Sequence, residues 1–230
     1  MRAPTSLLSL ATARQILFDE AMKLGAFLEK EKLRLVLAES CSGGMASAAL
    51  TCIPGMSEYF SGSLVTYRTD SKIKWLGVSP KALKKNGVVS EQVAAEMAIT
   101  TLGITPEAKL AGSITGHLGP DAPKDLDGVV YCAVAIRVPD SKDLAVFTSR
   151  NRLAAPQKFS ALDLRQWRQL AASHSLLMVV RSLLEDLANP DNQSTVSFEE
   201  EPEMEAVVVK NRQGAKKKNG THPKNKRRKR

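Results

Sequence analysis

Ser57, Tyr67 and Lys72 lie within sixteen residues and carry groups that can hydrolyse an amide. A serine hydroxyl is a nucleophile when a base removes its proton, and a lysine is such a base when burial lowers its pKa. A tyrosine hydroxyl between them can relay or orient a proton. Three such residues also occur this close by chance, so spacing alone favours a capping serine, a core-edge tyrosine and a surface lysine.

Glu39–Gly44, which reads ESCSGG, has the composition of a turn between a strand and a helix. Backbone N–H groups at a glycine-rich helix start attract an anion such as a phosphate, and the hydroxyls of Ser40 and Ser42 add donors. Gly43 and Gly44 would allow the close approach that a β-carbon blocks. The alternatives are a tight turn with a serine cap, and a site in which Ser40 rather than Ser57 is the nucleophile.

A third segment, Ser113–Asp121, passes from an apolar run into a loop rich in glycine and proline. Open α/β sheets bind ligands at the carboxyl ends of their strands, so Thr115 and Gly116 are predicted to contact a ligand. His117 lies in the same loop. The sequence is consistent with two roles for this residue, either a base or a structural, solvent-facing histidine.

The elements around these segments alternate between strands and helices. Strands are predicted at 33–38, 62–67, 110–115, 128–138 and 143–148, the last two joined as a hairpin by Pro139-Asp140. Helices are predicted at 11–30, 45–50, 71–76, 90–102 and 162–187. This order predicts an α/β fold: a three-layer α/β/α sandwich with a mixed sheet, spanning residues 10–188.

Charge separates this domain from the remaining residues, 189–230. The chain has 33 Lys/Arg and 24 Asp/Glu, but residues 210–230 contain eleven Lys/Arg and no acid, which leaves the rest near neutral. An acidic patch precedes the basic run. We predict a disordered, acidic-then-basic tail that does not pack on the domain, either a solvated extension or a segment making non-specific contact with nucleic acid.

Other classes of protein are disfavoured by composition. The three cysteines form no CxxC pair, so neither a disulfide framework nor a metal site is predicted, and we expect no cofactor. No apolar run approaches the ~18 residues that span a bilayer, so we expect a cytoplasmic protein without membrane contact.

Together, ESCSGG, the GMS…LVTYRTDSK block, GVVSEQVAAEMA and SITGHLGPDAP resemble, in order and spacing, the successive signatures of the CinA C-terminal domain family. The resemblance covers residues 11–187. It implies hydrolysis of the carboxamide of nicotinamide mononucleotide to nicotinate mononucleotide and ammonia. It places the family's Ser-Tyr-Lys set on Ser57, Tyr67 and Lys72. Substrate contacts then fall on Ser40, Ser42, Gly43, Gly44, Thr115, Gly116 and Arg168.

Two segments depart from the family pattern. The Gly-Asp-Arg before the last helix falls on Leu162-Asp163-Leu164, with Arg165 one residue later, and the two residues after Thr115-Gly116 are His117-Leu118. Two alternatives to the amidase therefore remain. One is a nucleotide-binding module without activity, and the other is an accessory protein that binds nucleic acid through the tail. For the amidase we expect a nucleotide as the small-molecule substrate and a homodimer.

Overall fold

The computed structural model describes residues 9–154, 159–189 and 204–209, which form one mixed sheet with helices on both faces. The strand order is β2-β1-β3-β4-β5-β6. β1 pairs in parallel with β2 and β3, while β3–β4, β4–β5 and β5–β6 are antiparallel. The strands are β1 (Leu35–Glu39), β2 (Phe60–Val65), β3 (Leu110–Gly116), β4 (Val129–Arg137), β5 (Leu144–Arg152) and β6 (Met204–Val209).

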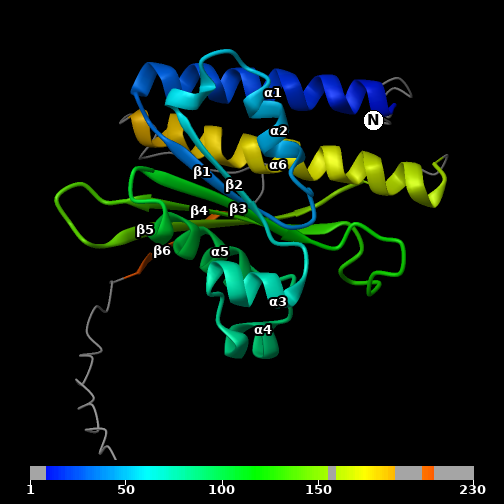
Figure 1. Cartoon of the computed structure of the whole chain (residues 1–230). Coiled ribbons are helices and arrows are strands. Elements are labelled where there is room, and N and C mark those ends of the chain that lie inside the picture. Colours follow the sequence, from blue (N-terminus) through cyan, green and yellow to red (C-terminus); the bar gives the residue numbers. More distant parts are fainter. Residues whose placement is uncertain (1–8, 155–158, 190–203, 210–230) are drawn as a thin grey trace, which may run out of the picture.

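The helices form two outer layers, which confirms the predicted α/β/α sandwich (Figure 1). One layer holds α1 (Leu10–Glu31), α2 (Met45–Thr51) and α6 (Ala161–Ala188). The other holds α3 (Thr69–Ser71), the π-helical turn η3 (Lys72–Leu76), α4 (Pro80–Asn86) and α5 (Glu91–Ile104). A short 3-10 turn, η2 (Met56–Glu58), precedes β2.

The largest buried cluster lies between the sheet and the α1–α6 layer, and two smaller ones involve α5. Leu24 and Leu28 of α1 and Leu176 of α6 are fully buried in the largest one with Leu37 of β1. A β-carbon at Gly112 of β3 would lie 2.8 Å from Leu37 Cδ2 and 3.0 Å from Val180 Cγ2 of α6, so glycine allows α6 to pack this closely on the sheet. This packing fixes the strand ends at which the predicted site residues lie.

The prediction that residues 189–230 do not pack on the domain is wrong for β6. Residues 204–209 pair with β5 from Leu144↔Val209 to Ser149↔Met204. The outer edge of β5 offers a row of backbone N–H and C=O groups, and Val207–Val209 supplies β-branched residues that favour a strand. Residues 190–203 and 210–230 lie outside the described residues, and so does the predicted contact of the basic run with nucleic acid.

Within the described ranges, none of the helices combines the length and apolar character required to cross a bilayer.

Candidate functional site

The site lies at the carboxyl ends of β1, β2 and β3, which meet at one edge of the sheet because these strands are parallel. Ser40 follows β1, Tyr67 and Lys72 follow β2, and Thr115 and Gly116 end β3. A cavity of about 260 Å³ opens there. Its lining includes Ser40, Cys41, Tyr67, Thr69, Lys72, Thr115, Gly116, His117, Gly119, Asp121 and Arg165.

Ser40 and Lys72 form the chemical centre of this cavity. Lys72 Nζ lies 2.7 Å from Ser40 Oγ and 2.5 Å from the carbonyl oxygen of Thr66, and the lysine is only 2% exposed. Burial lowers the pKa of Lys72 from 10.5 to about 8, although the neighbouring Cys41 offsets part of this effect. Burial also raises the pKa of the Cys41 thiol to about 12, so this group stays neutral. Lys72 therefore has a substantial neutral population near pH 8, with a hydroxyl already in contact.

The short turn η3 holds Lys72 in place. Its first residue is Lys72 and its last is Leu76, which is buried with Val78 in a cluster beside β1. The N–H of Val78 donates to the carbonyl oxygen of Lys72 at 3.1 Å, which closes the turn. The burial of Leu76 thus anchors one end of η3 while the lysine at the other end reaches Ser40.

The predicted phosphate contact at Ser42–Gly44 is contradicted by the position of Glu39. This fully buried carboxylate accepts hydrogen bonds from Ser42 Oγ (2.7 Å) and from the N–H groups of Gly44 (3.0 Å), Ala46 (3.3 Å) and Ser47 (2.9 Å). It therefore occupies the start of α2, where an anion was expected. Ser42, Gly43 and Gly44 build the turn that presents Ser40 and do not line the cavity. The acid at the head of the ESCSGG motif was the sequence signal for this arrangement.

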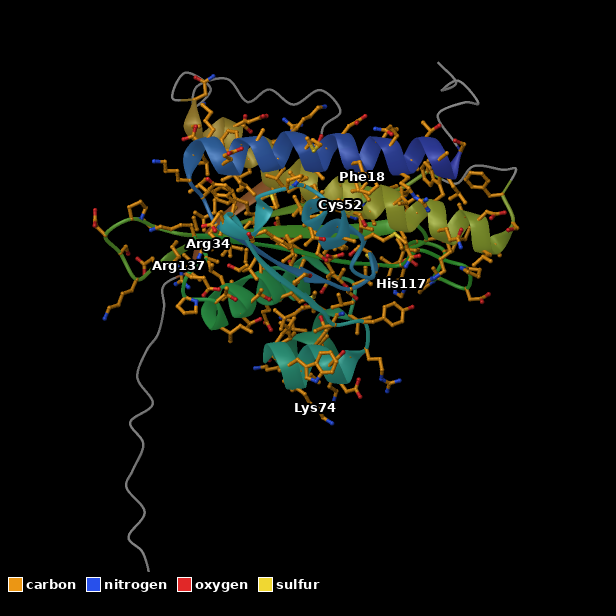
Figure 2. All side chains as sticks on the ribbon, turned by 45° about the horizontal axis from the view of Figure 1, so that its top comes forward. Phe18, Arg34, Cys52, Lys74, His117 and Arg137 are labelled. Atoms are coloured by element: carbon orange, nitrogen blue, oxygen red, sulfur yellow. The ribbon has the colours of Figure 1, made fainter. Side chains whose placement is uncertain are left out.

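Ser57 is not part of this site, and its predicted pairing with Lys72 is not found. It is exposed in η2, before β2, whereas Lys72 follows β2. The six residues of β2 extend over roughly 17 Å. Arg34 Nε donates to the carbonyl oxygen of Glu58, next to Ser57, and Figure 2 places Arg34 and His117 at opposite ends of the sheet. The predicted pairing of Ser57 with Lys72 did not take account of the strand that was itself predicted between them.

Tyr67 lines the cavity mouth together with Arg165, a residue that sequence reasoning did not assign to the site. Arg165 donates to Tyr67 Oη at 2.7 Å and to the carbonyl oxygen of Gly119 at 2.6 Å. Tyr67 is 62% exposed and is fixed by this bond rather than by burial. A cation from the first turns of α6 is thereby placed at the mouth of the cavity.

Arg168, predicted to contact substrate, instead anchors the loop that forms one wall of the cavity. It is 1% exposed and donates to both carboxylate oxygens of Asp127, at 2.7 and 2.9 Å. It also donates to the carbonyl oxygen of Leu118 at 3.3 Å. The guanidinium holds the pKa of Asp127 below its usual range. Arg168 uses its guanidinium for these bonds and is not one of the residues that line the cavity, so its predicted substrate contact is not found.

Thr115 and Gly116 lie at the cavity as predicted. The Thr115 hydroxyl is occupied, because it donates to the carbonyl oxygen of Val88 at 2.8 Å. A β-carbon at Gly116 would lie 2.6 Å from Val130 Cγ1 and 3.1 Å from Cys41 Sγ. The lack of a side chain at Gly116 therefore makes room for Cys41, and thereby for Ser40 next to it.

Comparison with known proteins gives the same family along most of the chain. A CinA-like protein of Solibacter usitatus is 41% identical over 114 residues, 49% of this chain and 27% of that protein. A CinA-like protein of Dictyoglomus thermophilum is 38% identical over 141 residues, 59% of this chain and 34% of that protein. The chain thus spans about a third of the length of these curated relatives.

A crystal structure of a competence or damage-inducible protein from Enterobacter asburiae superposes with a TM-score of 0.62 at 29% identity, covering 73% of this chain and 98% of that one. The profile of the CinA C-terminal domain matches residues 19–170, which include every residue of the cavity described above. The chain belongs to the CinA C-terminal domain family.

Proposed function

We propose that this chain hydrolyses a carboxamide, with Ser40 as the nucleophile and Lys72 as its base. The observation that carries the proposal is the buried contact of 2.7 Å between Lys72 Nζ and Ser40 Oγ, beside a cavity. A serine needs a base to become a competent nucleophile, and a lysine with a pKa near 8 serves as one close to neutral pH.

The first half of the reaction forms an ester on the enzyme. Neutral Lys72 takes the proton of Ser40 as Oγ attacks the carboxamide carbon, which gives a tetrahedral intermediate. Lys72, now an ammonium, passes that proton to the departing nitrogen. The C–N bond breaks, ammonia leaves, and the acyl group remains on Ser40.

The second half returns the enzyme to its starting state. Lys72 is neutral again and takes a proton from a water molecule that attacks the ester carbon. The C–Oγ bond breaks and Ser40 recovers its proton from Lys72. The products are a carboxylic acid and a free serine, so one amide and one water give one acid and one ammonia.

Nicotinamide mononucleotide is the substrate that we propose, because the motifs shared with the CinA C-terminal domain family imply it. The cavity supports this choice in two ways. Its volume of about 260 Å³ suits a ligand of small-molecule size, and its mouth carries the Arg165 guanidinium, which complements a phosphate. The carboxamide would then lie at Ser40 with the phosphate toward solvent.

The test is ammonia release by the purified chain from nicotinamide mononucleotide, nicotinamide riboside and free nicotinamide, with chromatography of the acid product. We expect nicotinate mononucleotide and ammonia in equal amounts from the mononucleotide. The rate should rise with pH and level off above about pH 8, because only neutral Lys72 acts as a base.

Two controls make the result interpretable. Ser40→Ala removes the nucleophile, so its preparation measures contaminating amidase. Lys74→Met changes an exposed lysine in the middle of the same turn, which Figure 2 shows on the side away from the sheet, and it should keep the full rate. Ammonia release that Ser40→Ala leaves unchanged would exclude the proposed chemistry.

A further inference from the structure

The imidazole of His117 lines the cavity and is half-buried. Within residues 9–154 and 159–189, its side chain makes no hydrogen bond or ion pair. Of the other groups that line the cavity, Ser40 and Lys72 bind each other, and Arg165 binds Tyr67. A half-buried polar group that faces a cavity without a partner is available to a ligand.

The backbone of His117 makes two hydrogen bonds, whereas its side chain makes none within the ranges given above. Its N–H donates to the carbonyl oxygen of Val129 at 3.0 Å, and its carbonyl oxygen accepts from the N–H of Gly128 at 2.9 Å. The pairing of β3 with β4 therefore extends beyond the last residue of β3. His117 projects from a continued strand and not from an independent loop, which suits a residue that positions a ligand.

The sheet register places His117 outward from the reacting serine. Glu39 is level with Ile114, so Ser40 comes level with Thr115, and His117 lies two residues further along the neighbouring strand. At about 3.3 Å per residue and about 4.8 Å between strands, the Cα atoms of Ser40 and His117 are roughly 8 Å apart. Thr115 and His117 share one face of the strand by alternation. His117 thus lies toward the part of a substrate remote from the bond that Ser40 attacks.

The charges near His117 favour an anion. Lys72 and Arg165 line the same cavity, and so do Asp121, Tyr67 and Cys41. Cys41 is neutral because burial raises its pKa to about 12, and Asp121 is exposed to water. Two basic side chains and the imidazole therefore face a single, solvent-screened carboxylate.

We infer that His117 binds the phosphate of the substrate, together with Arg165 at the cavity mouth. The inference rests on the proposed function, because it takes a carboxamide at Ser40 as the opposite end of the ligand. His117 is then a residue that determines specificity: it selects phosphorylated over unphosphorylated amides.

The experiment measures ligand binding by calorimetry in a Ser40→Ala background, which prevents turnover. Nicotinamide mononucleotide, nicotinamide riboside and ribose 5-phosphate are titrated. Adding His117→Gln should weaken binding of the two phosphorylated ligands about tenfold, since the bond of the imidazole to the phosphate is lost. Riboside binding should not change.

Matched variants separate this role from a loss of fold. His174→Gln changes the half-buried histidine of α6, which is outside the cavity, and should bind all three ligands as the Ser40→Ala background does. His117→Leu removes the imidazole without adding a polar group and should repeat the effect of His117→Gln. Thermal melting of each variant confirms that it is folded under the conditions of the titration.

Each outcome decides between the proposals. Equal phosphate-ligand affinities with and without His117 overturn the inference, and so does an equal loss for riboside and mononucleotide. If ribose 5-phosphate binding depends on His117 while the unmodified chain releases no ammonia from nicotinamide mononucleotide, the inference is upheld and the proposed function fails.

Discussion

Replacing Lys72 by Met should abolish amide hydrolysis and, near neutral pH, change the stability of the fold in a pH-dependent way. The native protein buries Lys72 almost completely, and burial lowers its pKa from 10.5 to about 8. Burial therefore opposes the ammonium form. A methionine of similar length carries no charge and escapes this cost.

The magnitude follows from the pKa change. A shift of about 2.5 units corresponds to about 3 kcal/mol, at about 1.36 kcal/mol per unit. Because the folded pKa lies below the unfolded one, the cost is fully present below about pH 8 and disappears as the pH rises to about 10.5. The bonds to Ser40 and Thr66 that Met cannot make lower the stability of the variant by an amount that depends little on pH.

Urea unfolding of the parent and of Lys72→Met between pH 6 and pH 10 measures this difference. The free energy of unfolding of Lys72→Met, relative to the parent, should be highest at pH 6 and fall by up to about 3 kcal/mol toward alkaline pH. Lys74→Met, which changes an exposed lysine of the same turn, should show no such trend. A difference between Lys72→Met and the parent that stays constant with pH would refute the reasoning, because Lys72 would then carry its charge without penalty.

Three further changes test the framework of the site. Glu39→Gln places an amide NH₂ among backbone N–H donors and should lower the free energy of unfolding by about 2 kcal/mol in urea titrations. Asp127→Asn leaves the charge of the buried Arg168 unpaired and should cost about 2 kcal/mol. In the parent, the ion pair stabilises the fold above the usual pKa of an aspartate, and this stabilisation should be lost as the pH falls from there through the lower pKa of Asp127, as acid titration can show. Gly116→Ala should cost about 1–3 kcal/mol and slow ammonia release, because its β-carbon would clash with Val130.

Much of the fold follows from local patterns. The five strands from Leu35 to Arg152 and the long helices α1 and α6 appear within two to four residues of the predicted bounds, because their apolar spacing also sets which face they bury. The antiparallel hairpin at Pro139-Asp140 was evident from its turn residues. Strand β6 was not predicted, because the acidic residues around it indicated a disordered segment. Its formation depends on the open edge of β5, with which it pairs.

The site was predictable only in part, because the fold and not the distance in sequence decides which side chains meet. Motifs identified Ser40, Tyr67 and Lys72, and the structure places them around one cavity. A strand was predicted at 62–67, but the pairing of Ser57 with Lys72 left its length out of account: a strand of six residues places the side chains before and after it at opposite ends of the sheet. Likewise, the sequence alone did not show that the carboxylate of Glu39 is buried and binds the N–H groups at the start of α2.

The most direct test of the account compares Ser40→Ala with Ser57→Ala in ammonia release from nicotinamide mononucleotide, with both variants confirmed to be folded. Ser40 contacts the lysine base at 2.7 Å. Ser57 is exposed and lies in η2, before the first residue of β2 and thus at the end of this strand remote from Lys72. The account predicts that Ser40→Ala lowers the rate by orders of magnitude and that Ser57→Ala keeps it within about twofold of the parent. Full activity of Ser40→Ala together with an inactive Ser57→Ala would contradict it.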